Sequence, residues 1–485
     1  MAALTLRVSR LSGQTCEVQA AAAWTVADLR RAAEAELGGL SQIVRESGEI
    51  LADASALSDV GVKHMETVVG LARQPQLVSN SCGHALSMSD GRVFTRGEDP
   101  SSRYLLPGHL CDVRKLVANN AAFAALKGDG SVQTWGDTTA GGDSEAVQSM
   151  LKNVKELHAT WLAFAALRED GVVVCWGSPH FGADASAVQE QLTGVHQICA
   201  ASRSFGAIRQ DGSVVAWGDG FYGGDCSMVE EQLSNVQQLV GSDSAFAARR
   251  DDGTVVTWGN HGGDSSLVRG ELYAVRRLYS AGDAFAGLRE DGSVVTWGQP
   301  RRGGDSHQVQ SQLRNVQDIK STEANFAAIL EDGSVIPWGR LSVFQDDGSS
   351  LEPPAPLLRV TELVSNFGAY AALMEDGSVI TWGDSAFGAD STSVQSELRH
   401  IRGLVASHAA FAAVTAEGSV VSWGDPSCGG DCSKILDELV DVVELLGSDS
   451  VFAALRSNGS AIVWGGENCE ATVHGGPRSP TDVAT

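Results

Sequence analysis

Residues 245–259 have the sequence AFAARRDDGTVVTWG, in which two short apolar runs flank the pair Asp252-Gly253. An Asp-Gly pair between such runs predicts a tight β-hairpin, because both central turn residues must then tolerate positive φ. Trp258-Gly259 closes the second run. We expect the glycine to let the chain leave the sheet directly after the tryptophan.

This unit recurs through most of the chain. The hairpin glycines of its ten copies are Gly91, Gly130, Gly171, Gly212, Gly253, Gly292, Gly333, Gly377, Gly418 and Gly459. A Trp-Gly closes nine copies, at Trp135, Trp176, Trp217, Trp258, Trp297, Trp338, Trp382, Trp423 and Trp464, and Arg96-Gly97 closes the first. Successive closing positions lie 39, 41, 41, 41, 39, 41, 44, 41 and 41 residues apart. Such a regular period predicts a repeat architecture.

Each unit is predicted to contain three strands, which in the fifth copy are 236–240, 245–248 and 254–258. The second and third strands carry apolar residues at both alternating positions, so we expect sheets that are buried on both faces by neighbouring sheets. Each tryptophan would then be a wedge between sheets. The first and last copies are as apolar as the others, whereas an open stack normally carries polar capping repeats. We therefore expect a closed ring in which the sheet near Trp464 packs against the sheet near Arg96, and an open solenoid is the alternative.

A Gly-Gly-Asp segment follows most of the third strands. Asp225 or Ser227 is a good helix N-cap, and Val229 and Leu233 share one helical face, so a short linker helix is predicted between sheets. The linker acids recur at Asp143, Asp184, Asp225, Asp264, Asp305, Asp390 and Asp431. Calcium-binding glycine-aspartate repeats need a much shorter period, so helix capping is the preferred interpretation of these acids.

Residues 1–74 do not share the repeat. Their pattern predicts a hairpin, a helix with a capping box at Thr25 to Asp28, and further short strands, with Val26, Leu29, Ala33 and Leu37 on one helical face. This order, and above all the segment SGEILADASALSD at 47–59, resembles ubiquitin. The resemblance implies a binding patch at Leu11, Arg45 and Leu71, although Arg45 departs from an apolar patch and the two leucines could be ordinary surface. The chain continues past 74, so a conjugated modifier is not expected.

The repeat resembles those of the regulator of chromosome condensation family. Its Phe-Ala-Ala-Leu-x-x-Asp-Gly-Ser-Val-x-x-Trp-Gly stands unbroken from Phe123 to Gly136. The family folds as a seven-bladed β-propeller of longer units, whereas this chain has ten units of about 41 residues. The resemblance implies a mainly β protein. We expect a ubiquitin-like β-grasp domain at 1–74, a propeller-type repeat array with short linker helices at 75–470, and a C-terminal tail at 471–485.

Composition limits the partners. The formal net charge is −25, which argues against nucleic acid because binding phosphates requires a basic surface. No run of eighteen apolar residues and no signal peptide are present, so no membrane partner is expected. Nine cysteines at irregular spacings fit reduced thiols in a cytoplasmic or possibly nuclear protein, and they form no zinc motif.

One copy breaks the pattern after Trp338-Gly339. The Gly-Gly-Asp segment is replaced by an irregular stretch at 340–357, and irregular loops on a regular scaffold often carry function, although simple sequence drift is the alternative. Its candidate binding residues are Arg340, Phe344, Asp346 and Asp347. No catalytic motif and no cofactor site is found.

The sequence therefore predicts a non-enzymatic protein-binding scaffold connected to the ubiquitin pathway. The alternatives are a guanine-nucleotide exchange factor for a small GTPase, with the 340–357 stretch as its wedge, and a purely structural repeat protein.

Overall fold

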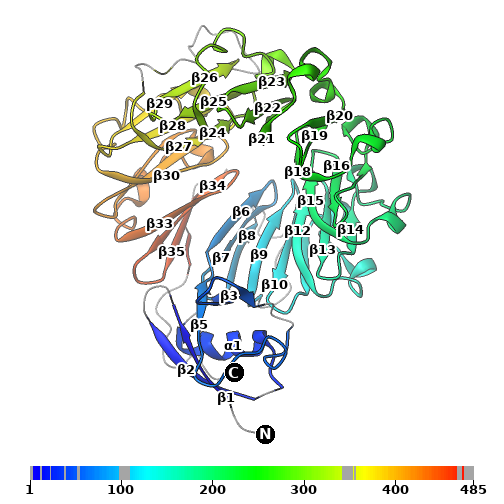
Figure 1. Ribbon diagram of the computed structural model, residues 1–485. Helices are drawn as coiled ribbons and strands as arrows, with labels where there is room; N and C mark the ends of the chain where they lie inside the picture. Colours follow the sequence, from blue (N-terminus) through cyan, green and yellow to red (C-terminus); the bar gives the residue numbers. More distant parts are fainter. Residues whose placement is uncertain are drawn as a thin grey trace.

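The computed structural model describes residues 4–474 except 11–13, 22, 38–39, 52–54, 98–109, 341–352, 354–356 and 467–471. The described residues form one five-stranded sheet with a helix at the N-terminus, followed by ten small antiparallel sheets. Figure 1 shows these ten sheets arranged in a ring, with the N-terminal sheet and helix beside the ring near strands β7 to β10. Two of the predicted sites, Leu11 and the set Phe344, Asp346 and Asp347, lie outside the described residues.

The N-terminal sheet has the strand order β2-β1-β5-β3-β4, with β1 parallel to β5 and the other pairs antiparallel. Its elements are β1 (Leu4–Ser9), β2 (Thr15–Ala20), α1 (Val26–Leu37), β3 (Leu40–Arg45), β4 (Ile50–Leu51) and β5 (Thr67–Ala72). Thr25 and Asp28 cap the helix reciprocally, because each backbone N–H donates to the side chain of the other residue, at 2.9 and 3.3 Å. Val26, Leu29, Ala33 and Leu37 are buried in the core of this sheet, as the helical face predicted.

Each of the ten sheets is called a blade here, numbered in chain order. Blades 1 to 5 consist of β6 (Gln76–Asn80), β7 (Gly83–Ser87) and β8 (Val93–Gly97); β9 (Val113–Ala118), β10 (Ala122–Lys127) and β11 (Val132–Gly136); β12 (Val154–Ala159), β13 (Ala163–Arg168) and β14 (Val173–Gly177); β15 (Val195–Ala200), β16 (Ser204–Arg209) and β17 (Val214–Gly218); β18 (Val236–Gly241), β19 (Ala245–Arg250) and β20 (Val255–Gly259). Blades 6 to 10 consist of β21 (Val275–Ala281), β22 (Ala284–Arg289) and β23 (Val294–Gly298); β24 (Val316–Ser321), β25 (Asn325–Leu330) and β26 (Val335–Gly339); β27 (Val360–Ser365), β28 (Ala369–Met374) and β29 (Val379–Gly383); β30 (Ile401–Ala406), β31 (Ala410–Thr415) and β32 (Val420–Gly424); β33 (Val442–Gly447), β34 (Val451–Arg456), β35 (Ala461–Gly465) and β36 (Thr472–His474). The first strand of each blade contacts the first strand of the next, so the first strands form the inner wall of the ring (Figure 1).

The ring is closed. Each joint between neighbouring blades has its own cluster of buried apolar side chains. In the joint between blade 10 and blade 1, Val451 and Leu455 pack with Leu77 and Leu86. The predicted contact between the last and first sheets is therefore confirmed, and the open solenoid is wrong. Arg96 occupies the register position of the missing tryptophan, opposite His84, but it is only half-buried.

The tryptophans join the blades as predicted. Trp258 stacks on Phe246 of its own blade, with ring centroids 5.4 Å apart, and packs in one cluster with Ile208 and Val214 of blade 4. Its Nε1–H donates to the carbonyl of Gly223, in the linker that follows blade 4, at 2.9 Å. The equivalent bonds, at 3.0 or 3.1 Å, are Trp176 to Gly141, Trp217 to Gly182, Trp338 to Gly303, Trp423 to Gly388 and Trp464 to Gly429. The indole nitrogen therefore bonds each of these blades to the linker before it.

The hairpin turns differ from the prediction. Arg250 O accepts from Gly253 N at 3.1 Å, so Asp251 and Asp252 form the centre of the turn. Gly253 follows with φ of 75°, whereas Asp252 is not among the residues with positive φ. The two central residues of the turn therefore do not need positive φ. Only Gly253, which follows them, takes the left-handed conformation. Asp252 contributes in another way, since its carboxylate accepts from Thr254 N at 2.9 Å.

The linker helices are short, as predicted, but they are 3-10 helices rather than α-helices. In the described linkers they lie first at Thr138–Ala140, Pro179–Phe181, Gly220–Tyr222, His261–Gly263, Pro300–Arg302, Ser385–Phe387 and Pro426–Cys428, and then at Glu145–Val147, Gln189–Gln191, Glu230–Gln232, Ser266–Glu271 and Ser433–Ile435. Asp225 accepts from Ser227 N at 2.9 Å and so closes a local turn rather than an α-helix. Leu233 is buried at the blade joint, whereas Val229 is only partly buried. Because only the leucine is fully buried, the linker can contact the blade joint without an α-helix that presents two apolar residues on one face.

A buried ion-pair cluster joins the N-terminal domain to blade 2. Asp112, just before β9, lies 2.8 Å from Arg73 Nη2 and 3.6 Å from Arg30 Nη1. Glu34 of α1 is the second carboxylate, 2.9 Å from Arg30. Both arginine side chains are almost fully buried. The two parts of the chain are therefore joined by charges, and removal of Asp112 would leave Glu34 as the one carboxylate of this cluster beside two buried arginines.

Candidate functional site at the loop end of the ring

The loop between the first and second strands places one residue of every blade at the same position around the inner rim. We call these ten residues the belt: Ser81, Asn120, Trp161, Ser202, Asp243, Gly282, Glu323, Phe367, His408 and Asp449. Belt residues of neighbouring blades are hydrogen-bonded through their backbones. Examples are Asn120 N to Trp161 O at 3.0 Å, Asp243 N to Gly282 O at 2.8 Å and His408 N to Asp449 O at 2.7 Å.

The belt is a position at which the repeat varies widely in chemistry. Nine blades place Phe or Tyr in the second strand opposite Trp in the third strand, whereas the belt includes small, amide, aromatic, acidic and imidazole side chains. The backbone N–H groups of most belt residues are used in the inter-blade bonds. A fixed scaffold therefore presents side chains that are free to differ, which is the arrangement of a recognition surface.

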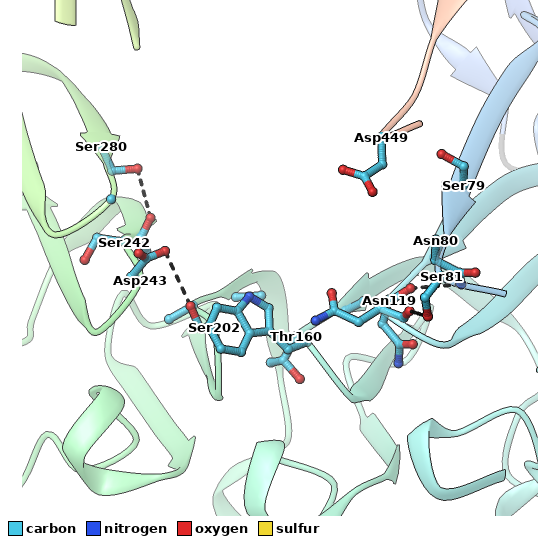
Figure 2. Close-up of a pocket in the computed structure, with 18 residues that line it drawn as sticks. Ser79, Asn80, Ser81, Asn119, Thr160, Ser202, Ser242, Asp243, Ser280 and Asp449 are labelled. Atoms are coloured by element: carbon cyan, nitrogen blue, oxygen red, sulfur yellow. Dashed lines mark hydrogen bonds between the residues drawn. The ribbon is translucent and has the colours of Figure 1, made fainter. Parts of the chain in front are cut away.

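Seven belt residues line one cavity of about 780 Å³ at the mouth of the ring: Ser81, Asn120, Trp161, Ser202, Asp243, Gly282 and Asp449. Figure 2 shows Asp243 on one side of this opening and Asp449 on the other. The rest of the lining is mainly Ser, Asn, Thr, Ala and Gly. Asp243 accepts from Ser202 Oγ at 3.5 Å, while Asp449 is 64% exposed. Among the described residues of the lining, those two carboxylates are the only charged groups.

Aromatic side chains gather beside the cavity, around Arg203. The guanidinium lies 4.6 Å from the ring centre of Tyr222, 4.9 Å from that of Phe181 and 5.8 Å from that of Trp161. Trp161 is 43% exposed and Phe221, next to Tyr222, is 61% exposed. Stacking holds the arginine in place, and the exposed rings offer large rigid surfaces of the kind found at protein interfaces.

An arginine and three carboxylates meet at the next part of the belt. Arg302 Nη1 lies 3.2 Å from Asp243 and also donates to Glu323, and its Nε lies 4.0 Å from Asp283. Gly282 leaves room for this arginine, because a Cβ there would lie 2.3 Å from Nη1. Burial, together with the negative charge of Asp243, raises the pKa of Glu323 to about 7. The charge of this cluster therefore changes near neutral pH.

On the other side of the ring the belt continues with a second aromatic group. Phe367 stacks on Phe387, with centroids 5.1 Å apart, and lies 4.6 Å from the ring centre of His408. His408 Nδ1 is 3.8 Å from Asp449. Both belt rings are partly exposed.

Of the binding residues predicted from the sequence, Arg45, Leu71 and Arg340 lie within the described residues. Arg45 is half-buried and lies 2.7 Å from Glu66 and 3.0 Å from Glu49, so its charge is balanced within the N-terminal domain. Leu71 is half-buried in β5. Arg340 lies at the loop end of blade 7, where its backbone N–H donates to Ala324 O at 3.2 Å.

The sequence reasoning missed the belt, although the belt residues have the same spacings as the closing positions. An alignment of the ten units places these residues in a variable loop between two constant strands, but it does not separate them from their variable neighbours. Among the described residues, no three His, Cys, Asp or Glu side chains gather as a metal site. No helix in the described part of the chain is long and apolar enough to cross a membrane.

No protein-family model and no curated protein sequence matches this chain. Solved structures with similar folds include Prp20p from Saccharomyces cerevisiae, at 17% identity over 61% of this chain and 80% of that chain, with a TM-score of 0.31. Others are the CRINKLY WD40 ectodomain of the Arabidopsis thaliana receptor kinase ACR4, at 14% identity over 55% and 93% with a TM-score of 0.30, and the computationally designed protein Ika8, at 15% over 64% and 96% with a TM-score of 0.32. The strand pairing and joint packing within the described residues of this chain define a closed, propeller-type ring of ten blades.

Proposed function

We propose that this protein is a non-enzymatic, protein-binding ring, and that the belt is its binding surface. The observation that supports this most directly is that seven chemically varied belt residues, contributed by units far apart in the sequence, line a single cavity. Exposed Trp161 and Phe221 beside the cavity supply the aromatic anchors that protein interfaces favour.

We also propose that residues 1–74 form a ubiquitin-like domain, with the repeat array at 75–470 and a tail at 471–485. The order β2-β1-β5-β3-β4, the parallel pairing of β1 with β5 and the packing of α1 support this interpretation. β36 adds one strand from the tail to blade 10. A ubiquitin-like domain held against a binding ring would bring a bound partner to the ubiquitin pathway. The proposed location is cytoplasmic or nuclear, since none of the eight described cysteines forms a disulfide.

The test is proximity labelling in cells with the full chain. Trp161→Ala and Phe221→Ala should each lose the same group of labelled proteins. Met228→Ala, which also truncates a large exposed apolar side chain, in a linker outside the belt, should keep that group. Equal labelling by all three variants would reject the belt as the binding surface.

Ubiquitin-pathway components should be enriched among the labelled proteins, and their enrichment should fall when Asp112→Asn loosens the N-terminal domain. Exchange activity remains the alternative, and most of the 340–357 segment that would carry it lies outside the described residues. Release of labelled GDP from a panel of small GTPases checks it. Acceleration by the wild-type chain would favour the exchange factor over the scaffold.

A further inference from the structure

We propose that the belt cavity binds a cationic segment, rich in Lys or Arg, of the protein partner. This inference rests on the proposed function, because it names the chemistry of the partner that the belt would recognise. The segment enters the mouth of the ring between Asp243 and Asp449, which face each other across the opening in Figure 2.

The charge of the lining carries the argument. Among the described residues the lining contains two carboxylates and no Lys or Arg side chain. Two arginines beside the belt are engaged within the protein, Arg302 by Asp243 and Glu323 and Arg203 by aromatic rings. One guanidinium shared among Asp243, Asp283 and Glu323 leaves excess negative charge there, and Asp449 lies 3.8 Å from the imidazole of His408 and is 64% exposed.

The uncharged lining fits the same ligand. Ser81 and Asn120 are exposed in the cavity and supply oxygen atoms that accept from ammonium or guanidinium groups. Trp161 lies between these residues and Ser202 in the belt, and its exposed indole can contact the aliphatic stem or the charged end of Lys or Arg. An anionic segment would meet two carboxylates without any free cation in the lining, so the site also selects against acidic partners.

A protein segment is favoured over a small polycation by the form of the site. The contacts are spread over seven blades around an open mouth, so an extended chain can reach several of them at once whereas a small ion reaches few. The overall charge of −25 further assists the approach of a basic partner.

The experiment measures binding of a fluorescent peptide of alternating Lys and Gly, and of its Glu-Gly counterpart, to the full chain by anisotropy. The wild type should bind the Lys peptide, more weakly as salt rises, and should not bind the Glu peptide. The double variant Asp243→Asn/Asp449→Asn should weaken binding about fivefold, since each exposed ion pair contributes roughly a factor of two or three. Asp449→Asn alone, which leaves the Arg302 cluster intact, should account for about half of this loss on a logarithmic scale.

The matched control is Glu290→Gln/Glu331→Gln, which removes the same charge from two exposed acids at the hairpin end of blades 6 and 7. Equal weakening by the control would overturn the inference, because it would show diffuse attraction to an acidic surface. Displacement of the peptide by spermine at equal charge concentration would also overturn it in favour of a polyamine site. If peptide binding ignores the belt but Trp161→Ala still loses the labelled partners in cells, this inference fails and the proposed function stands. If neither peptide binding nor partner labelling depends on the belt, the inference and the proposed function are both rejected.

Discussion

The bond from each tryptophan to the preceding linker gives a sharp test of how the blades are joined. Trp258 and Trp297 are equally buried, at 5% and 3% exposure, and each stacks on a phenylalanine, at 5.4 and 5.5 Å. Trp258 Nε1 donates to Gly223 O, whereas Trp297 Nε1 has no hydrogen-bond partner among the described residues. The linker before Trp297 is two residues shorter than the one before Trp258. The two sites therefore differ mainly in one hydrogen bond.

Replacement of either tryptophan by phenylalanine removes similar apolar volume, which costs roughly 1–2 kcal/mol at both sites. Trp258→Phe also loses a bond worth about 1 kcal/mol and leaves a buried carbonyl without its donor. Trp297→Phe instead removes a buried N–H group that has no partner. We therefore expect Trp258→Phe to reduce the free energy of unfolding by about 1–3 kcal/mol more than Trp297→Phe.

Urea unfolding of the full chain, followed by far-ultraviolet circular dichroism, measures this difference from the midpoints. The slopes of the two transitions must agree for the midpoints to be compared. Equal losses would show that stacking and burial alone join the blades and that the hydrogen bond contributes nothing. A larger loss for Trp297→Phe would contradict the assignment of the bond altogether.

Three further predictions follow from the joints and the ion-pair clusters. Gly223→Ala should lower the free energy of unfolding by more than about 2 kcal/mol, because φ is 86° and the new Cβ would lie 2.8 Å from an aromatic carbon. Gly220→Ala in the same linker is the control, since its Cβ would meet nothing closer than 3.5 Å and should be tolerated. Thermal melts of the two variants measure the difference. Glu323→Gln should stabilise the protein above pH 7 but not below about pH 4.5. Because the pKa of Glu323 is raised in the folded protein, the wild type loses stability as pH rises between these two values. If the variant and the wild type show the same dependence of melting temperature on pH, Glu323 does not titrate in this cluster as proposed. Removal of 449–485 should lower the protection of amide protons in every blade, since it opens the ring, and protection lost only next to the cut would argue against closure as a source of stability.

The structure agrees with the sequence for the hairpins and for the strands buried on both faces, whose signals are local. The fifteen residues around Asp252-Gly253 indicate a hairpin, and alternation on both faces of β19 and β20 indicates burial by neighbours. The wedge position of Trp258 follows from the same pattern. The linker was mispredicted because Val229 and Leu233 at helical spacing equally suit a 3-10 turn that buries only the leucine.

Ring closure could be argued from the sequence only indirectly, from the absence of polar capping units. Its physical cause is tertiary, since Val451 and Leu455 find Leu77 and Leu86 only when ten successive joints turn the chain through a full circle. The number of blades in one ring is likewise set by the packing of each joint, which a single unit does not encode.

The sequence by itself determined the repeat, the hairpins, the buried faces and the separate N-terminal unit, because each depends on residues that are close together in the chain. Only the tertiary structure decided the candidate site. Asp243 and Asp449 are two of ten belt residues that carry no local signature, and each belongs to a loop that is unremarkable in its own unit. They become one surface because closing the ring brings loops about 41 residues apart in sequence, and finally the two ends of the array, to the same rim.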